Sequence, residues 1–295
     1  MRALPILASL WVAACSCSGA GPTAAGPTPY VRCAMREPAP IDATVGALHL
    51  HGEGRTLTIE GAAAPLRIAA FRGAALAEEP LEPALDEIEA GGPALQIALG
   101  SLGDDAAHVQ ALLTALATLS TPTLVVLGGR DHPADLDTAL AALPPEARAR
   151  IVDASAYRRI DVGGVELIPA AGAPEGRYAR DDEACGLGAG DAESIASDVG
   201  EAEGAPPRFL ISFAGPAPLP GIDGGEAGSA SIAALAEAVG ARATLYAWPD
   251  AAGTATALLV PPLAGPPALL ADGARLSPGA LGVTLSETGA APAAP

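Results

Sequence analysis

Residues 94–127 read ALQIALGSLGDDAAHVQALLTALATLSTPTLVVL, an apolar run, a periodic segment and a second apolar run in succession. The periodic segment, Asp104–Leu119, predicts a helix because its apolar residues recur at helical spacing. They are Val109, Leu112, Leu113, Leu116 and Leu119. The runs Ala94–Leu99 and Thr123–Leu127 have the length and composition of buried strands. This stretch therefore predicts a strand–helix–strand unit.

The alternation continues on both sides of this unit. The other expected elements are a hairpin of Ala47–His51 and Thr56–Glu60 around the turn 52–54, a strand at Leu66–Phe71, helices at Leu81–Ala90 and Pro133–Leu143, a strand near Ile151, a hairpin of Tyr157–Val162 and Val165–Pro169, a strand at Phe209–Phe213, a helix at Ser229–Val239, a strand at Ala243–Trp248, and three more apolar strands out to about Ser286. The polar, acidic stretch Gly172–Pro207 predicts a long loop. Together these segments predict an α/β (α+β) fold, a mixed sheet architecture covered by helices.

The charge of the chain argues against two classes of partner. Its 295 residues carry a formal net charge of −18, and all 16 cationic residues are arginine. Such a polyanion is repelled by nucleic-acid phosphates and by anionic lipid headgroups. The sequence also lacks a basic stripe interleaved with aromatic residues. We therefore expect no nucleic-acid partner.

The N-terminus has the pattern of an export signal. Met1 and Arg2 give a positive start, and the apolar run Ala3–Ala14 is too short to cross a bilayer core of about 30 Å. The run ends in VAAC at residues 12–15, which resembles the lipobox of bacterial lipoproteins. The resemblance implies that Cys15 carries a diacylglycerol. The alternative is an ordinary signal peptide with a cysteine nearby.

These features predict how the chain is divided and where it resides. We expect a lipoprotein signal peptide at 1–14, a flexible Gly/Pro/Ala tether at 15–40, a folded domain at 41–288 and an Ala/Pro tail at 289–295. The expected location is the cell envelope, at the periplasmic face or the outer membrane, with lipid on Cys15 as the membrane contact. If Cys15 is acylated, three cysteines remain. A disulfide between Cys33 and Cys185 is one possibility, since an exported protein can form it.

Five short motifs follow the expected strands. In order they are AAFRG (69–73), ALGS (98–101), LGGRD (127–131), LISF (210–213) and YAWPD (246–250). Their order and strand-end context resemble the ligand motifs of the calcineurin-like metallophosphoesterases, which are D-x-H, G-D, G-N-H-D/E, a lone His and G-H-x-H. The resemblance implies a four-layer αββα sandwich of two facing mixed sheets. It also implies an ancestral site for two metal ions. A generic α/β domain without this ancestry is the alternative.

The residues at the ligand positions are not metal ligands. The vestigial positions are Ala70, Arg72, Ser101, Gly129, Arg130, Asp131, Phe213, Trp248 and Asp250. Of the family's acids only Asp131 survives, and in the family this acid supports catalysis rather than holding metal. The two arginines add positive charge that repels divalent ions. We therefore expect no metal and no other cofactor, and we interpret the domain as a pseudoenzyme.

Two other groups could carry chemistry. Arg72 and Arg130 could bind phosphate or carboxylate, or they could pair with Asp131 or Asp250 and fill the vacated site. His49 and His51 share one face of a strand, which by itself is half of a metal site. The leading functional hypothesis is an inactive lipoprotein domain that binds a protein or a small molecule, or acts as a scaffold. The rival is a phosphoesterase with a site rebuilt around Asp131, His132 and Asp250.

Overall fold

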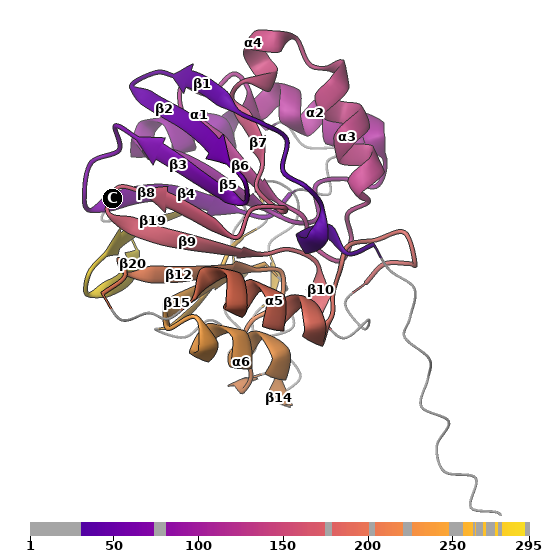
Figure 1. The fold of residues 1–295 in the computed structure, drawn as a ribbon. Helices are drawn as coiled ribbons and strands as arrows, with labels where there is room; N and C mark the ends of the chain where they lie inside the picture. Colours follow the sequence, from indigo (N-terminus) through magenta and orange to yellow (C-terminus); the bar gives the residue numbers. More distant parts are fainter. Residues whose placement is uncertain are drawn as a thin grey trace, which may run out of the picture.

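A computed structural model describes residues 31–73, 81–174, 179–200, 204–220, 226–247, 256–261, 263, 268–269, 275–276 and 279–292. Two large β-sheets dominate it, one with six strands and one with eight. Figure 1 shows the helices on the outer sides of these sheets. The α/β class and the two facing mixed sheets that the sequence predicts are confirmed. Within the described part of the chain, none of the helices is both long and apolar enough to cross a membrane.

The six-stranded sheet has the strand order β20-β19-β4-β5-β6-β7. The strands are β4 (Leu66–Phe71), β5 (Leu95–Leu99), β6 (Thr123–Val126), β7 (Ile151–Asp153), β19 (Leu281–Ser286) and β20 (Gly289–Pro292). Strands β4 to β7 pair in parallel, and β19 pairs antiparallel to β4. The connecting helices are α1 (Glu82–Gly91), α2 (Ala106–Leu116), α3 (Pro133–Ala142) and α4 (Pro145–Arg148). Because the strands are parallel, their carboxyl ends share one edge of the sheet.

The eight-stranded sheet has the order β1-β2-β3-β8-β9-β12-β15-β16. Its strands are β1 (Asp42–Val45), β2 (Leu48–Glu53), β3 (Thr56–Glu60), β8 (Arg159–Val162), β9 (Val165–Ala170), β12 (Arg208–Ser212), β15 (Ala241–Tyr246) and β16 (Ala257–Leu259). Helices α5 (Ala189–Val199) and α6 (Ala230–Ala238) lie against the half of the sheet that contains β9, β12 and β15. Of the helices that the structure describes, none lies over the outer face of β1–β3 in Figure 1.

Short two-stranded sheets complete the fold. They are β10 (Ala173–Pro174) with β11 (Gly186–Leu187), β13 (Leu219–Pro220) with β14 (Glu226–Ala227), and β17 (Ala268–Leu269) with β18 (Arg275–Leu276).

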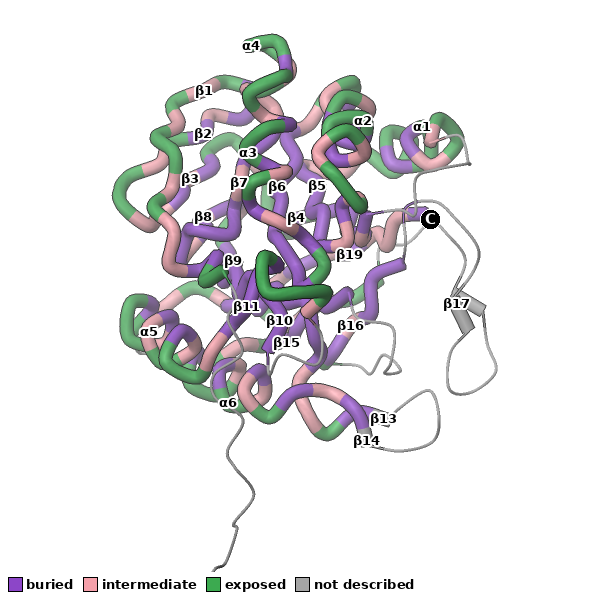
Figure 2. The backbone as a smooth tube through the Cα atoms, turned by 90° about the vertical axis from the view of Figure 1, so that its right-hand side faces the viewer, coloured by how far each residue is buried: buried purple, intermediate pink, exposed green. Residues whose placement is uncertain are grey.

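The core lies between the two sheets. Figure 2 shows buried strands in the interior and exposed residues mainly on the helices and the outer hairpin. Strand β4 illustrates the two faces: the Arg67 side chain donates to the Gly91 carbonyl at the end of α1, so odd-numbered residues face the helices. The Leu66 side chain packs on Gly163, in the turn between β8 and β9, where an added Cβ atom would lie 3.2 Å from it. The even-numbered residues of β4 therefore face the second sheet. Ala70 and Arg72 share that inner direction.

Three sequence expectations are wrong. The stretch Gly172–Pro207 is not one long loop, because it contains β10, β11 and the helix α5. The expected Ala/Pro tail 289–295 begins with a strand, because residues 289–292 form β20, which pairs antiparallel with β19. The expected tether 15–40 includes an ordered part, which we call the N-terminal strap (residues 31–37). The strap contains a 3-10 helix, η1 (Cys33–Met35), in which Cys33 and Ala34 are completely buried.

Candidate functional site

The turns that carry the vestigial positions meet in space. The Gly73 N–H donates to the Gly100 carbonyl over 2.8 Å, which joins the ends of β4 and β5. The Gly172 N–H donates to the Leu127 carbonyl over 2.8 Å and thereby links the two sheets beyond β6 and β9. A bond of 3.2 Å from the Ala247 N–H to the carbonyl of residue 213 joins the ends of β15 and β12. These turns form one cluster at the carboxyl ends of the strands, which we call the strand-end cluster.

The Phe213 ring fills the centre of the strand-end cluster. This residue follows β12 in the eight-stranded sheet and is completely buried. A Cβ atom added to Gly128 would lie 2.6 Å from the Phe213 Cε2 atom, and one added to Gly100 would lie 2.8 Å from Cδ2. The ring therefore packs directly on the backbone of two turns of the opposite sheet. A phenyl ring stands where the resemblance places a histidine ligand.

Asp131 is the acid of the cluster, and its carboxylate is bound by backbone groups. It accepts N–H bonds from Leu102 (2.7 Å), Ser101 (3.0 Å) and Gly128 (2.7 Å). Gly100 and Ser101 both adopt left-handed conformations, with φ of 64° and 53°. These two residues turn the backbone after β5, so that successive N–H groups point at the same carboxylate. Asp131 thus fastens the turn after β6 to the turn after β5.

The environment of Asp131 also changes its protonation. Burial raises the pKa of this carboxyl to about 6, although the three N–H donors and Arg130 act in the opposite direction. Only 3% of the residue is exposed. A buried carboxylate whose oxygens already accept three hydrogen bonds is a structural fastening and has little capacity left for a metal ion.

The remaining described vestigial positions offer no ligand set. Ala70 is completely buried and Gly129 is buried, while Ser101 contributes its backbone N–H to Asp131. Burial lowers the pKa of the Arg72 guanidinium, and its Nε atom has no hydrogen-bond partner among the described residues. Arg130 is exposed.

The described residues contain no ion pair from either arginine to a carboxylate, so the proposed pairing of these arginines with Asp131 is not formed. Trp248 and Asp250 lie outside the described residues, and so does the lipidation candidate Cys15.

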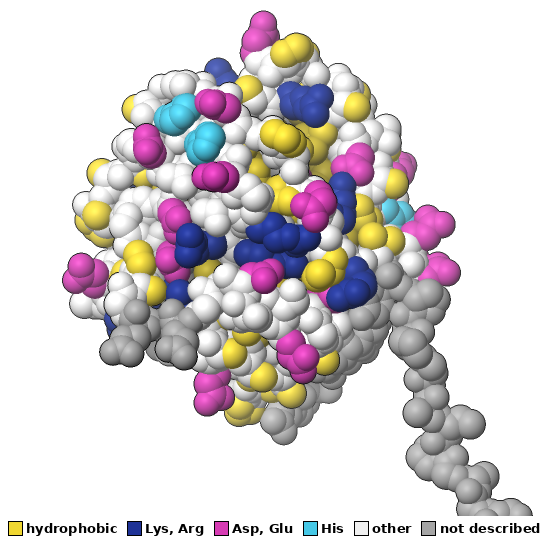
Figure 3. All heavy atoms as spheres, viewed as in Figure 1, with side chains coloured by type: hydrophobic (Ala, Val, Ile, Leu, Met, Phe, Trp, Pro, Cys, Tyr) yellow, Lys and Arg dark blue, Asp and Glu magenta, His cyan; other side chains and the backbone are white. Residues whose placement is uncertain are grey.

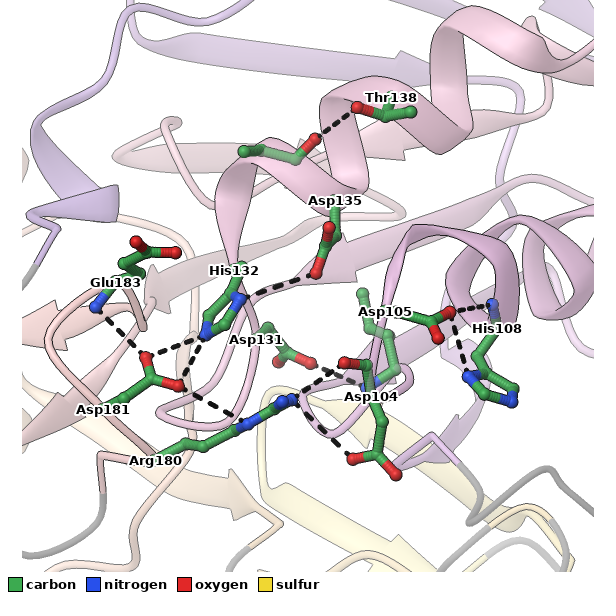
Figure 4. A network of polar contacts seen from close by, with 12 residues as sticks. Asp104, Asp105, His108, Asp131, His132, Asp135, Thr138, Arg180, Asp181 and Glu183 are labelled. Carbon is green, nitrogen blue, oxygen red and sulfur yellow. Dashed lines mark hydrogen bonds and ion pairs between the residues drawn. The ribbon is translucent and has the colours of Figure 1, made fainter.

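His132 is directed away from Asp131. Figure 4 shows its ring between two other acids. The Nε2 atom lies 2.8 Å from Asp181, and Nδ1 lies 3.5 Å from Asp135. Arg180 extends beside this group and donates to the Asp104 carbonyl over 3.1 Å. Because the two ring nitrogens point in opposite directions, each acid binds its own side of the imidazole.

The segment 179–187 covers the turn after β6. The Arg180 N–H donates to the Gly129 carbonyl over 2.7 Å, and the Cys185 N–H donates to the Asp131 carbonyl over 3.0 Å. The segment is in turn bonded to the N-terminal strap, because Cys33 and Cys185 form a disulfide with a Cα–Cα distance of 5.4 Å. The disulfide that the sequence left as one possibility is confirmed.

Side chains from the body hold the strap in place. The Arg55 guanidinium donates to the Ala34 and Met35 carbonyls over 3.1 and 3.2 Å. Arg36 donates to Asp153 over 3.1 Å. The Val31 carbonyl accepts a bond of 2.8 Å from the Gly186 N–H, next to the disulfide. The strap is therefore part of the folded domain.

Sequence reasoning missed a buried ion pair at the opposite end of the sheet. Arg208, at the start of β12, donates to Glu166 over 2.6 Å, and both residues are buried. The same guanidinium donates to the carbonyls of Gly200 and Val239, where α5 and α6 end. A cation is favoured there because helix carboxyl ends carry partial negative charge. An arginine immediately before an apolar strand was the one available signal.

Comparisons with known proteins show a shared fold. The sequence matches no protein-family model. It also matches no curated protein. One crystal structure resembles the chain with a TM-score of 0.50 and 14% identity, over 76% of this chain and 97% of the other. A second, the crystal structure of TT1561 of Thermus thermophilus, gives a TM-score of 0.45 and 17% identity, over 62% and 81%. At this level of identity the first likeness supports the architecture alone.

Proposed function

We propose that this chain is an exported lipoprotein whose body is a degenerate calcineurin-like metallophosphoesterase domain without catalysis. In this proposal Cys15 carries the lipid, and the domain binds a protein or a small molecule, or serves as a scaffold in the cell envelope. The observation that carries the assignment of an inactive domain is the position of Phe213. Its ring packs on Gly100 and Gly128 in the strand-end cluster, where the ends of six strands meet.

The chemistry of phosphate ester hydrolysis explains why this packing matters. A dimetal site needs oxygen or nitrogen ligands around two ions, together with space for a water molecule and the phosphate. The strand-end cluster instead presents a phenyl ring, the methyl group of Ala70 and a carboxylate already bound by N–H groups. These groups support a domain that keeps its fold through apolar contact and hydrogen bonds in place of metal.

The rival proposal is a working phosphoesterase with ligands from Asp131, His132 and Asp250. Two of these residues lie in the described part of the chain, and they point to different partners. Asp131 binds backbone N–H groups, whereas His132 lies between Asp135 and Asp181. This divergence favours the inactive domain.

A hydrolysis assay separates the two proposals. The intact chain, purified in detergent, is incubated with p-nitrophenyl phosphate and with bis(p-nitrophenyl) phosphate in the presence of Mn²⁺. We expect no release of nitrophenol above the rate without protein. Turnover that is abolished both by a chelator and by His132→Gln would overturn the inactive-domain proposal. The variant controls for a contaminating phosphatase, which would be insensitive to it.

The lipid anchor needs an independent test. The chain is expressed in a bacterial host that is fed labelled palmitate. We expect the label to enter the wild-type chain and the chain to partition into detergent, while Cys15→Ser abolishes both. Cys17→Ser is the matched control and leaves both unchanged. Labelling that persists in Cys15→Ser would refute the assignment of the anchor.

A further inference from the structure

Two histidines are exposed on the open face of the eight-stranded sheet. His49 and His51 alternate along β2 with Leu48 and Leu50, which are buried in the core. The two imidazoles therefore leave the same face of the strand, separated by about 6.8 Å along the backbone. Their side chains are 44% and 51% exposed. Figure 3 shows two histidines side by side over β1 and β2, with acidic side chains around them.

The neighbouring strand supplies a third ligand. Asp42 on β1 is the register partner of His51, so both side chains emerge on one face. One carboxylate oxygen lies 3.7 Å from His49 Nε2, and the other lies 3.9 Å from His51 Nδ1. On the other side, Glu60 of β3 is the register partner of His49. The Asp42 carboxylate is thus within reach of both imidazoles.

We propose that His49, His51 and Asp42 form a surface site for a divalent transition metal ion, with Zn²⁺, Cu²⁺ and Ni²⁺ as the favoured ions. Two imidazoles and one carboxylate are the donor set that these ions prefer over Mg²⁺ or Ca²⁺. Three protein ligands leave a fourth position for water or for a group from a partner. The proposal does not depend on the strand-end cluster or on the lipid anchor.

Metal binding requires the three side chains to rotate toward one another. Among the residues that the structure describes, no three His, Cys, Asp or Glu side chains already converge in ligand geometry. Ligand atoms at 2.0–2.1 Å in a tetrahedron are about 3.4 Å apart. In the structure the two carboxylate oxygens of Asp42 lie 3.7 and 3.9 Å from different rings, so the side chains must rotate to bring one oxygen and both imidazole nitrogens around a single ion. All three side chains are exposed and can rotate, whereas the two paired strands hold their backbones in register.

The other two histidines lack this arrangement. His108 on α2 pairs with Asp105, which also caps the helix by accepting the His108 N–H. The two acids beside His132 occupy opposite sides of its ring. The net charge of −18 raises the local concentration of cations around the whole molecule but does not select the β1–β2 face. Selection comes from two imidazoles that share a carboxylate.

Calorimetric titration with Zn²⁺ tests the site directly. The intact chain is used in detergent, without a polyhistidine tag, and its free thiols are alkylated so that Cys15 and Cys17 cannot bind the metal. We expect one equivalent of Zn²⁺ to bind. His49→Gln and His51→Gln each weaken binding on the order of tenfold or more, a loss that even changes around a metal-bound histidine can reach. Asp42→Asn weakens it in the same direction.

Two further measurements make the outcome decisive. His108→Gln removes an exposed histidine from another face, and we expect it to bind Zn²⁺ like the wild type. Titration with Co²⁺ gives visible d–d absorption from nitrogen and oxygen ligands, which should disappear in His49→Gln while the circular dichroism is unchanged. Zn²⁺ affinity equal to the wild type in both His49→Gln and His51→Gln, or no binding to the wild type, would overturn the proposal.

Discussion

Replacing Gly128 with alanine tests whether the Phe213 ring fills the strand-end cluster. The new Cβ atom would lie 2.6 Å from Cε2 and 2.8 Å from Cγ of the ring, closer than carbon atoms approach in proteins. Gly128 is not among the residues with positive φ, so its backbone accepts alanine. The cost is therefore one of overpacking, about 1–3 kcal/mol of unfolding free energy. Phe213→Ala alone should cost about 3–5 kcal/mol, because it leaves a cavity.

The double variant carries the test. Once the Phe213 ring is removed, the methyl group of Gly128→Ala occupies space that the ring has left, so its own cost should disappear. We expect the two substitutions to be non-additive by about 2 kcal/mol, in the range seen for residues in direct contact. Equilibrium unfolding in urea, followed by far-ultraviolet circular dichroism, measures all four proteins with the disulfide intact.

A matched control excludes a general effect of alanine. Gly190 lies in α5, and a Cβ atom added there meets no described residue within 4 Å. Gly190→Ala should leave stability unchanged or raise it by up to about 1 kcal/mol. Additive effects of Gly128→Ala and Phe213→Ala would refute the packing described for the cluster.

Three other predictions concern the Arg208–Glu166 ion pair, the disulfide and the Asp131 carboxyl group. Arg208→Met leaves Glu166 buried without its partner and should lower the unfolding free energy by about 3–5 kcal/mol. Adding Glu166→Leu should recover part of this loss. If urea unfolding shows that the costs of the two substitutions simply add, the prediction is contradicted. Replacing Cys33 and Cys185 together with alanine opens a loop of sequence separation 152 and should cost about 5 kcal/mol, after which a reductant has no further effect on the urea midpoint. The raised pKa of Asp131, about 6 against 3.8 in the unfolded chain, means that the folded state holds the proton more tightly. The unfolding free energy should therefore fall by roughly 3 kcal/mol as the pH rises from about 4 to about 6. Urea midpoints measured across that range should decrease with pH in the wild type, and this decrease should be absent in Asp131→Asn.

Apolar periodicity was sufficient to predict most of the fold. Strand β4 has the bounds that its sequence predicts, because its apolar run at residues 68–71 ends at Arg72 and Gly73. Helix α2 follows its leucine stripe, although it begins at Ala106 with Asp105 as the cap. These elements are specified by their own residues and need no tertiary information.

The elements that the sequence did not predict depend on distant residues. Helix α5 buries only Asp191, Ile195 and Val199, and its other residues are small or polar. Its amino end is capped by Asp191, and its carboxyl end is held by Arg208. Strand β20 consists of Gly, Ala and Pro and exists through its pairing with β19.

The strand-end cluster was accessible from sequence only in part. The order of the glycine-containing turns indicated which residues would meet. The role of Asp131 depends on the left-handed backbone conformation of Gly100 and Ser101. A positive φ could not be predicted for Ser101, because serine rarely adopts it. The site at Asp42, His49 and His51 needed the strand register, because the aspartate joins the histidines only when β1 pairs with β2.

The disulfide also decides how the domain responds to mechanical load. A pull on the chain ahead of residue 31 reaches Cys33 and passes through the sulfur atoms into Cys185, which lies 152 positions further along the sequence. The polypeptide between the two cysteines then carries no tension, so β1 to β9 cannot be peeled away one after another from the amino end. A reducing environment would return that load to the hydrogen bonds and ion pairs of residues 31–37, and unravelling could begin there.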